Sequence, residues 1–236
     1  MTGTISENLA GVLERIGKAA RKVGRDPAEI TLLAVTKTVE IKRVKEAVSI
    51  GAKTLGENYV QEAGEKMEKI KDKAVRWHFI GHLQKNKVKL AVEMFDCIET
   101  VDSIELAQEI NKRAKEPIDC FIEVNIAREK TKTGVDAEGA VKLARAASTL
   151  PNIRLKGLLT IPPQCDSPEF SRPYFVALRR LAERINKERI PGVFLKELSM
   201  GMSGDFEMAV EEGATIVRVG TAIFGPRPEK KGSKAL

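Results

Sequence analysis

Short apolar runs alternate with amphipathic segments along most of the chain. Over residues 5–24 the apolar side chains recur every three or four positions, which predicts a leading helix. Ser6 is the expected N-cap of this helix and Gly24 its stop. The next apolar run, residues 30–35, is rich in strand-forming side chains and is followed by an amphipathic segment over residues 41–50. These two segments predict a first β/α unit.

The same alternation of strand and helix repeats through the chain. Strands are expected over residues 30–35, 53–55, 75–80, 97–101, 119–126, 154–161, 194–199 and 215–224. After the second to the seventh strand, helices are expected over about 58–72, 83–94, 103–115, 136–149, 170–188 and 205–212. Eight strands alternating with helices favour a parallel (β/α)8 TIM barrel, whereas six or seven would favour an open, doubly wound sheet.

The chain shows no internal boundary. No linker, low-complexity tract or change of composition divides it, so we expect a single domain over residues 1–236. Residues 228–236 are expected to form a frayed tail. Because the segment after the eighth strand is too short for a full helix, we expect the leading helix to cover the barrel wall there.

Composition narrows the classes of function. The 40 Lys and Arg outnumber the 33 Asp and Glu, giving a net charge of +7, but the two signs are interspersed. Few aromatic side chains are available for base stacking, with eight Phe, two Tyr and one Trp, which disfavours a nucleic-acid partner. No apolar run reaches the ~20 residues of a membrane span, and the N-terminus lacks an apolar signal segment. We therefore expect a cytoplasmic protein without a membrane partner.

Cysteine and histidine placement argues against disulfides and metals. Cys97, Cys120 and Cys165 are well separated and form no C-x-x-C pair, which excludes a disulfide framework and a zinc knuckle and indicates a reducing compartment. His78 and His82 are not in the helical context that an H-x-x-x-H metal site requires, and no compact carboxylate cluster stands near them. No catalytic metal is expected.

Candidate chemistry gathers where strands end. Lys37 directly follows the first strand, where partial burial would lower the pKa of its amine and make it a nucleophile; the alternative is a lysine in a surface turn. Ser199, Ser203, Gly220 and Thr221 lie at the carboxyl ends of the seventh and eighth strands and resemble a phosphate-binding cup, although ordinary turns use the same residue types. A lysine facing a phosphate site predicts a phosphorylated aldehyde, either pyridoxal 5′-phosphate (PLP) or an aldolase's sugar phosphate.

Three further residues bear on that choice. Arg218 stands two positions before the phosphate glycine and, if it points into the barrel, can donate to a pyridine nitrogen. The alternative for Arg218 is a structural ion pair with Glu57 or Glu197. Asn58 and His82, at the exits of the second and third strands, can flank the ring or its 3-hydroxyl.

Six ordered motifs resemble the pyridoxal phosphate homeostasis protein family over nearly the whole chain. The motifs are AVTKT (34–38), GENYVQE (56–62), HFIGHLQKNK (78–87), GLLTIP (157–162), LSMGMSGD (198–205) and VRVGTAIFG (217–225). The resemblance implies a single-domain, fold-type III barrel similar to the N-terminal domain of alanine racemases, with PLP held as an internal aldimine. It further implies a second, weaker PLP contact at Lys132, whose alternative is a simple turn before a helix.

The resemblance also assigns individual residues. The cofactor-binding set that it implies is Lys37, Asn58, His82, Ser199, Ser203, Arg218, Gly220 and Thr221. Lys37 then carries the aldimine, while Ser203, Gly220 and Thr221 hold the phosphate. Arg218 faces the pyridine nitrogen.

The same set favours a carrier over an enzyme. Racemisation needs acid/base groups on both faces of the cofactor, the second typically a tyrosine from an additional domain. We expect no such domain, and only Tyr59 to lie near the mouth. Arg218 would leave the ring nitrogen unprotonated and weaken the cofactor as an electron sink.

We therefore expect a protein with no catalytic residues that acts in vitamin B6 homeostasis. It would buffer PLP or deliver it to apo PLP-dependent enzymes, and it would be a monomer or a weak homodimer. The alternatives are a weak PLP-dependent racemase or lyase, and a cofactor-free Schiff-base aldolase.

Overall fold

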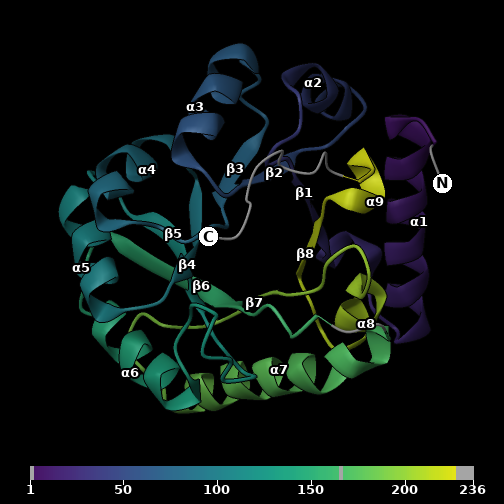
Figure 1. The fold of residues 1–236 in the computed structure, drawn as a ribbon. Coiled ribbons are helices and arrows are strands. Elements are labelled where there is room, and N and C mark those ends of the chain that lie inside the picture. Colours follow the sequence, from purple (N-terminus) through teal and green to yellow (C-terminus); the bar gives the residue numbers. More distant parts are fainter. Residues whose placement is uncertain (1–2, 165–166, 227–236) are drawn as a thin grey trace, which may run out of the picture.

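A computed structural model of the chain describes residues 3–164 and 167–226. Its centre is a closed barrel of parallel strands in chain order, sealed where β1 pairs with β8 (Figure 1). The strands are β1 Thr31–Val35, β2 Thr54–Glu57, β3 Arg76–Phe79, β4 Cys97–Val101, β5 Ile118–Glu123, β6 Ile153–Leu159, β7 Glu197–Ser199 and β8 Ile216–Val219. The predicted (β/α)8 barrel is confirmed.

Helices form a ring around the barrel (Figure 1). They are α1 Ile5–Lys22, α2 Ile41–Ser49, α3 Val60–Lys69, α4 Val88–Met94, α5 Ile104–Arg113, α6 Ala137–Ala147, α7 Arg172–Lys187, α8 Phe206–Glu211 and α9 Thr221–Phe224, with short 3-10 turns η1 Pro27–Glu29, η2 Lys85–Lys87 and η3 Pro168–Ser171. The longer helices are amphipathic and bury their apolar faces against the outer surface of the strands. This layer holds most of the core.

Alternate residues of each strand face either the barrel interior or the helices. A separate buried cluster inside the barrel comprises Leu33, Val35, Ile80, Cys97, Phe121 and Ile216. By the same alternation, Glu99 and Arg218 point inward, in step with Cys97 and Ile216. Glu57 instead points outward and contacts α3. Polar side chains therefore occupy two different environments, the barrel interior and the strand–helix layer.

The leading helix covers the wall beside β8, as expected. α1 lies alongside α8 and α9 (Figure 1), and Asn8 Nδ2 donates to the carbonyl of Ile223 at 3.0 Å. The predicted N-cap Ser6 is wrong: Thr4 caps the helix, because its hydroxyl accepts from the N–H of Glu7 while the Glu7 carboxylate accepts from the N–H of Thr4. Gly24, at φ +74°, follows the last turn as predicted.

The predicted eighth strand is too long. It ends at Val219, and residues 221–224 form α9 because the N–H groups of Ile223 and Phe224 turn back to the carbonyl of Gly220. An apolar run of this length fits a strand or a buried helical turn equally well, so periodicity could not separate them. β7 is likewise shorter than predicted and begins at Glu197.

Several sequence expectations concern chemistry away from the barrel mouth. Cys97 and Cys120 are free and buried, while Cys165 lies outside the described residues, as does the expected tail over 228–236. Among the described helices, none combines the length and apolar character that crossing a membrane requires.

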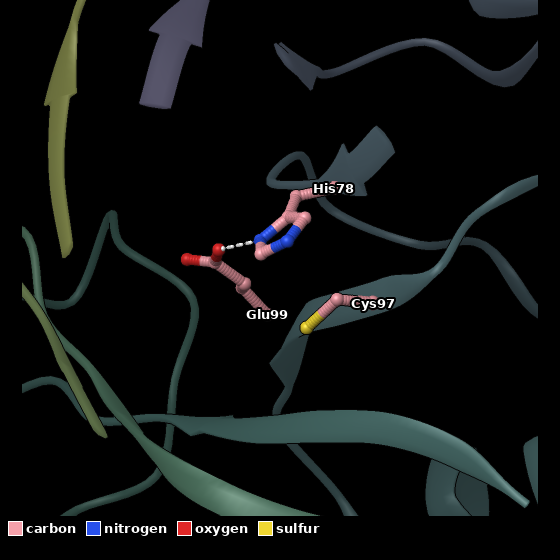
Figure 2. Close-up of side chains that lie close together, drawn as sticks. All are labelled: His78, Cys97 and Glu99. Atoms are coloured by element: carbon pink, nitrogen blue, oxygen red, sulfur yellow. Dashed lines mark hydrogen bonds and ion pairs between the residues drawn. The ribbon is translucent and has the colours of Figure 1, made fainter. Parts of the chain in front are cut away.

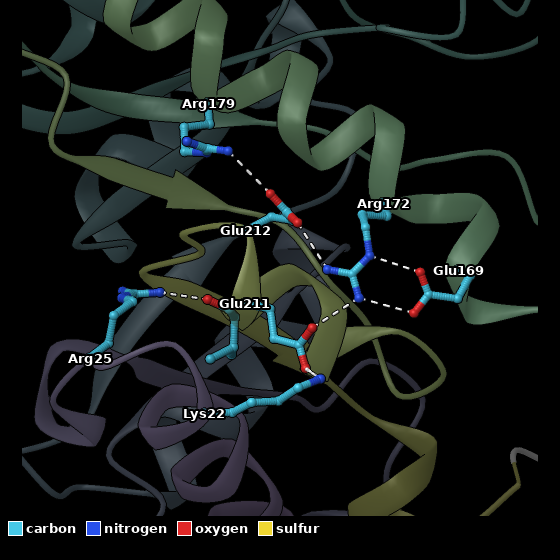
Figure 3. A network of polar contacts seen from close by, with 8 residues as sticks. Lys22, Arg25, Glu169, Arg172, Arg179, Glu211 and Glu212 are labelled. Atoms are coloured by element: carbon cyan, nitrogen blue, oxygen red, sulfur yellow. Dashed lines mark hydrogen bonds and ion pairs between the residues drawn. The ribbon is translucent and has the colours of Figure 1, made fainter.

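Charged side chains tie the start of α7 to α8 and α1 (Figure 3). Arg172 pairs with Glu169 of η3 at 2.8 Å and with both Glu211 and Glu212 of α8 at 2.9 Å. Glu211 also binds Lys22 of α1 at 2.6 Å. This network joins elements that are distant in sequence and anchors η3, whose Pro168 and Ser171 line the cavity described next.

Candidate cofactor site

A cavity of about 780 Å³ opens at the carboxyl ends of the strands. Six of the eight predicted cofactor-binding residues line it, together with Lys132. The six are Lys37, Asn58, Ser203, Arg218, Gly220 and Thr221. The volume suits a ligand of cofactor size. Residues as far apart in sequence as Lys37 and Thr221 are thus brought to one cavity.

Lys37 reaches the cavity from the end of β1. Thr36 and Lys37 continue the strand's alternation, so Thr36 faces the helices and Lys37 the cavity. β1 and β2 pack closely here because residue 56 is a glycine: a Cβ at Gly56 would lie 2.2 Å from Cδ2 of Leu33. The strand ends therefore pack closely under the lysine.

Hydrogen-bond donors gather around Ser203. Its Oγ accepts from the backbone N–H of Gly220 at 3.3 Å and of Ala222 at 3.2 Å. Asp205, the nearby acid, caps its own turn by accepting from the N–H of Met202 at 2.7 Å. A bound phosphate would compete with Ser203 Oγ for these two N–H groups, and the hydroxyls of Ser203 and Thr221 complete a donor set that fits it.

Arg218 lies in the barrel beneath these loops and is only 4% exposed. Its guanidinium donates to Oγ of Ser199 at 2.8 Å and to the carbonyl of Thr160 at 2.9 Å. Ser199 does not line the cavity but lies behind Arg218 and donates to Oε2 of Glu99 at 2.5 Å. The two partners considered from sequence do not pair with Arg218: Glu57 contacts Lys66.

Glu197, the other partner considered for Arg218, also binds a different residue. Its Oε2 accepts from the hydroxyl of Thr215 at 2.6 Å. Among the acids that act on Arg218, Glu99 of β4 has the largest effect, ahead of Asp205 and Glu123. Ser199 bridges Glu99 to the guanidinium. Glu99 was not singled out from the sequence, where the available signal was an acidic residue flanked by apolar Cys97, Ile98 and Val101.

Glu99 is the centre of a buried relay (Figure 2). Nδ1 of His78 lies 2.5 Å from Oε1 of Glu99, and Ser199 occupies the other oxygen. Burial alone would raise the pKa of Glu99, but the hydrogen bond and charge of His78, with Arg218 and Ser199, outweigh it and lower that pKa. Burial lowers the pKa of Arg218, and the charge of Glu99 opposes this. The relay therefore keeps a buried anion beside a buried cation.

Each histidine has one carboxylate beside it in the structure. Glu99 contacts His78, and Asp102 lies 3.5 Å from Nδ1 of His82. Donor atoms of His78, Cys97 and Glu99 come within 4.8 Å of one another (Figure 2). Both Glu99 oxygens already accept hydrogen bonds, and burial raises the pKa of the Cys97 thiol, so the geometry favours an internal hydrogen-bonded relay over a metal centre.

Of the two residues predicted to flank the ring, Asn58 lies in the cavity wall and His82 lies outside it. Asn58 lines the cavity, and its Oδ1 is buried with no hydrogen-bond partner among the described residues. Gly81 allows this placement, since a Cβ there would lie 2.3 Å from the carbonyl oxygen of Asn58. The side chain of His82 is 56% exposed beside Asp102 and does not line the cavity. An orphaned polar atom in the wall is consistent with a polar ligand in the cavity.

Lys132 extends from the loop after β5 to the cavity rim. Its Nζ donates to the carbonyl of Pro162 at 3.0 Å and pairs with Glu129 at 2.5 Å. Lys132 also lines a smaller adjoining cavity of about 240 Å³. The loop's lysine thus forms part of the wall between two spaces.

Comparison with known proteins places this geometry in a family. The family described as alanine racemase, N-terminal domain, matches residues 8–228. A pyridoxal phosphate homeostasis protein from Aquifex aeolicus is 48% identical over 224 residues, which are 94% of this chain and 97% of that protein. One from Escherichia coli K12 is 42% identical over 235 residues, covering 96% and 98%. The chain belongs to the pyridoxal phosphate homeostasis protein family.

Solved structures agree with this membership. PipY of Synechococcus elongatus, in the structure with PLP bound, is 33% identical, covers 94% of this chain and all of that one, and superposes with a TM-score of 0.82. An alanine racemase from Clostridium difficile is 18% identical with a TM-score of 0.71 and covers 97% of this chain but 59% of its own, which shows a shared fold. For this homeostasis-family chain, the relatives favour PLP over a sugar phosphate as the phosphorylated aldehyde.

Proposed function

We propose that this protein binds PLP through Lys37 and acts in PLP homeostasis, holding the cofactor and releasing it to apo PLP-dependent enzymes. The observation that carries the proposal is one cavity lined by a lysine and by a phosphate-compatible donor set around Ser203. The names of its relatives and the PLP-bound PipY structure support the same ligand.

Each cavity residue has a role in this proposal. Lys37 Nζ forms a C=N bond with the aldehyde carbon, and the carbonyl oxygen leaves as water with the two amine protons. Ser203, Gly220 and Thr221 bind the phosphate. Arg218 donates toward the ring nitrogen from below.

The remaining predicted contacts complete the proposed pocket. Asn58 offers its orphaned Oδ1 and its amide to the ring substituents. His82 acts from the rim and Ser199 through Arg218, since neither lines the cavity. Lys132 makes the second, weaker cofactor contact that we propose for the rim.

Little or no catalysis is proposed. Bound PLP supplies an electron sink whose strength depends on protonation of the ring nitrogen. Arg218 keeps its proton because Glu99 is a buried counter-charge in the same relay, so it presents a donor and does not protonate the ring. The proposed role is therefore storage and delivery.

We also propose that the protein works in the cytoplasm as a monomer or weak homodimer. Free, buried Cys97 and Cys120 are consistent with a reducing compartment. Sedimentation at micromolar concentration tests the oligomeric state. Faster activation of an apo-enzyme by the PLP-loaded protein than by an equal amount of free PLP tests delivery.

A spectroscopic titration tests cofactor attachment. Wild-type protein titrated with PLP should develop a visible absorbance band that Lys37→Ala abolishes, while Lys42→Ala, on exposed α2 surface, keeps it. Incubation of loaded protein with single amino acids tests the carrier role. Turnover faster than about 1 s⁻¹, within the ordinary range of enzymes, would replace the carrier with a racemase or lyase.

A further inference from the structure

One buried ammonium holds the chain around Lys37. Lys66 of α3 is 2% exposed. Its Nζ lies 2.6 Å from each of three acceptors, the carbonyl of Thr36, Oε1 of Glu57 and Oε1 of Glu62. An ammonium has three N–H donors, so each acceptor takes one and Lys66 is fully hydrogen-bonded where an unpaired charge would be disfavoured.

The cluster holds both neighbours of Lys37. On the N-terminal side, the Thr36 carbonyl accepts from the ammonium and the Thr36 hydroxyl donates to Oε1 of Glu57 at 2.6 Å. On the C-terminal side, the backbone N–H of Thr38 donates to Oε1 of Glu62 at 2.5 Å. The peptide units on either side of the lysine are thus fixed by the same group of charges.

Thr38 needs that restraint. Its φ of 60° lies in the left-handed region, which is rare for a β-branched residue. This conformation turns the chain out of β1 directly after Lys37. The Glu62 hydrogen bond therefore holds a turn that the intrinsic preference of threonine disfavours.

We propose that Lys66, Glu57 and Glu62 are positioning residues that fix the backbone on both sides of Lys37 and so direct its amine into the cavity. This inference rests on the proposed attachment of PLP to Lys37. None of the three is among the described residues that line the cavity. They act through the lysine and do not touch the cofactor.

The positioning role has a selective consequence. Formation of a covalent bond requires the amine to be aimed at the aldehyde carbon, and a displacement near 1 Å can cost up to about 100-fold in rate. The proposed phosphate contacts at Ser203, Gly220 and Thr221 come from other elements, and the Glu57–Lys66 pair still holds the chain beside Asn58 when only the turn at Thr38 is loosened. Loosening the turn should therefore weaken covalent attachment and leave non-covalent recognition intact.

The test uses Glu62→Ala in the full chain. Lys66→Met removes all three hydrogen bonds of the ammonium and so changes stability together with the turn, whereas the Glu62 side chain is 26% exposed and tolerates truncation. Glu65→Ala, on exposed α3 surface, is the matched control. Glu62→Gln keeps an acceptor for the Thr38 N–H and serves as the conservative variant.

Two probes separate attachment from recognition. PLP carries the aldehyde, and pyridoxine 5′-phosphate carries an alcohol in its place. For Glu62→Ala we expect about a tenfold slower rise of the visible band and about a tenfold weaker PLP affinity, with affinity for pyridoxine 5′-phosphate within twofold of wild type. Glu62→Gln should restore most of the loss, and Glu65→Ala should match wild type.

Any other result contradicts either the positioning role or the proposed function. Wild-type PLP kinetics in Glu62→Ala, or equal weakening of both probes, contradicts the positioning role. Lys37→Ala is measured alongside to separate failure of the proposed function from failure of the positioning role. If Lys37→Ala binds PLP as wild type does, the proposed function fails. If Lys37→Ala loses PLP while Glu62→Ala does not, the positioning inference alone fails.

Discussion

Glu57 and Glu99 are both fully buried carboxylates on barrel strands, yet their pKa values shift in opposite directions. In Glu57, burial raises the pKa more than Lys66 and Thr36 lower it. Both donors reach Oε1, and Oε2 has no hydrogen-bond partner among the described residues. In Glu99, donors reach both oxygens, so the lowering effects outweigh burial.

The difference reflects two regions with different tasks. Glu99 lies inside the barrel, where it balances the charge of Arg218 under the cavity. Glu57 lies between the barrel and α3, where it helps Lys66 fix the chain beside Lys37. One carboxylate acts on the cation that lines the cavity, and the other is bonded to the ammonium that holds the backbone beside Lys37.

Removing Glu99 should have the largest effect on stability. Glu99→Ala removes the acid that acts most strongly on the buried Arg218 guanidinium and leaves the weaker effects of Asp205 and Glu123, which should cost about 3 kcal/mol of unfolding free energy. Urea denaturation of the variant and of the exposed control Glu65→Ala measures the difference. A loss below about 1 kcal/mol would mean that the carbonyl of Thr160 and the hydroxyl of Ser199 compensate the cation by themselves.

Removing Lys66 should cost less than removing Glu99. Lys66→Met leaves Glu57 buried, but its raised pKa lets this carboxyl take up a proton and avoid an unpaired charge. We expect a loss of about 2 kcal/mol, measured by the same denaturation. A loss equal to that of Glu99→Ala would show that Glu57 stays ionised and that the two regions are electrostatically alike.

The partly buried network around Arg172, which lies closer to water than the two clusters above, provides a reference for their charges. Arg172→Ala breaks its pairs with Glu169, Glu211 and Glu212 (Figure 3). Because the Arg172 side chain is 28% exposed, we expect a loss of about 1 kcal/mol or less, which raised salt should reduce further. A salt-insensitive loss of about 3 kcal/mol would place this network with the buried clusters.

The smallest effect is a difference in pH dependence. The unfolded pKa of a glutamate is about 4.3. The raised pKa of Glu57 means that the folded state binds the extra proton, so the stability advantage of wild type over Glu57→Gln should fall as pH rises through the folded pKa. The lowered pKa of Glu99 gives the opposite sign: the advantage over Glu99→Gln is present above about 4.3 and is lost as pH falls through the folded pKa.

Unfolding free energies between pH 3 and pH 8 test those two signs. Parallel slopes for Glu57→Gln and Glu99→Gln would contradict the contrast between the two carboxylates.

Residues at strand ends were predictable from sequence, and residues inside the barrel were not. Lys37 and Thr221 could be assigned to the mouth because each follows directly on a strand or its final glycine, and strand ends share one face of a barrel. The partner of Arg218 depends on how β4, β7 and β8 face one another across the interior. No local pattern encodes that, so Glu57 and Glu197 were considered as partners and Glu99 was not.

The buried Lys66 had a readable signal. It follows Val60 and Ala63 at three-residue spacing on the buried face of α3, where a lysine is unexpected unless paired. Its partners, however, come from the ends of β1 and β2 and become visible only after the strands are placed. His82 shows the converse: a position just after β3 predicted the mouth correctly, but not that the side chain turns toward Asp102.

The most direct test of the central claim is borohydride reduction of the PLP-loaded protein followed by peptide mass spectrometry. Reduction converts the C=N bond to a stable amine and marks the lysine that held the cofactor. We expect one dominant phosphopyridoxyl adduct on Lys37, with any adduct on Lys132 at much lower yield. An adduct spread over surface lysines, or absent from Lys37, would contradict the account.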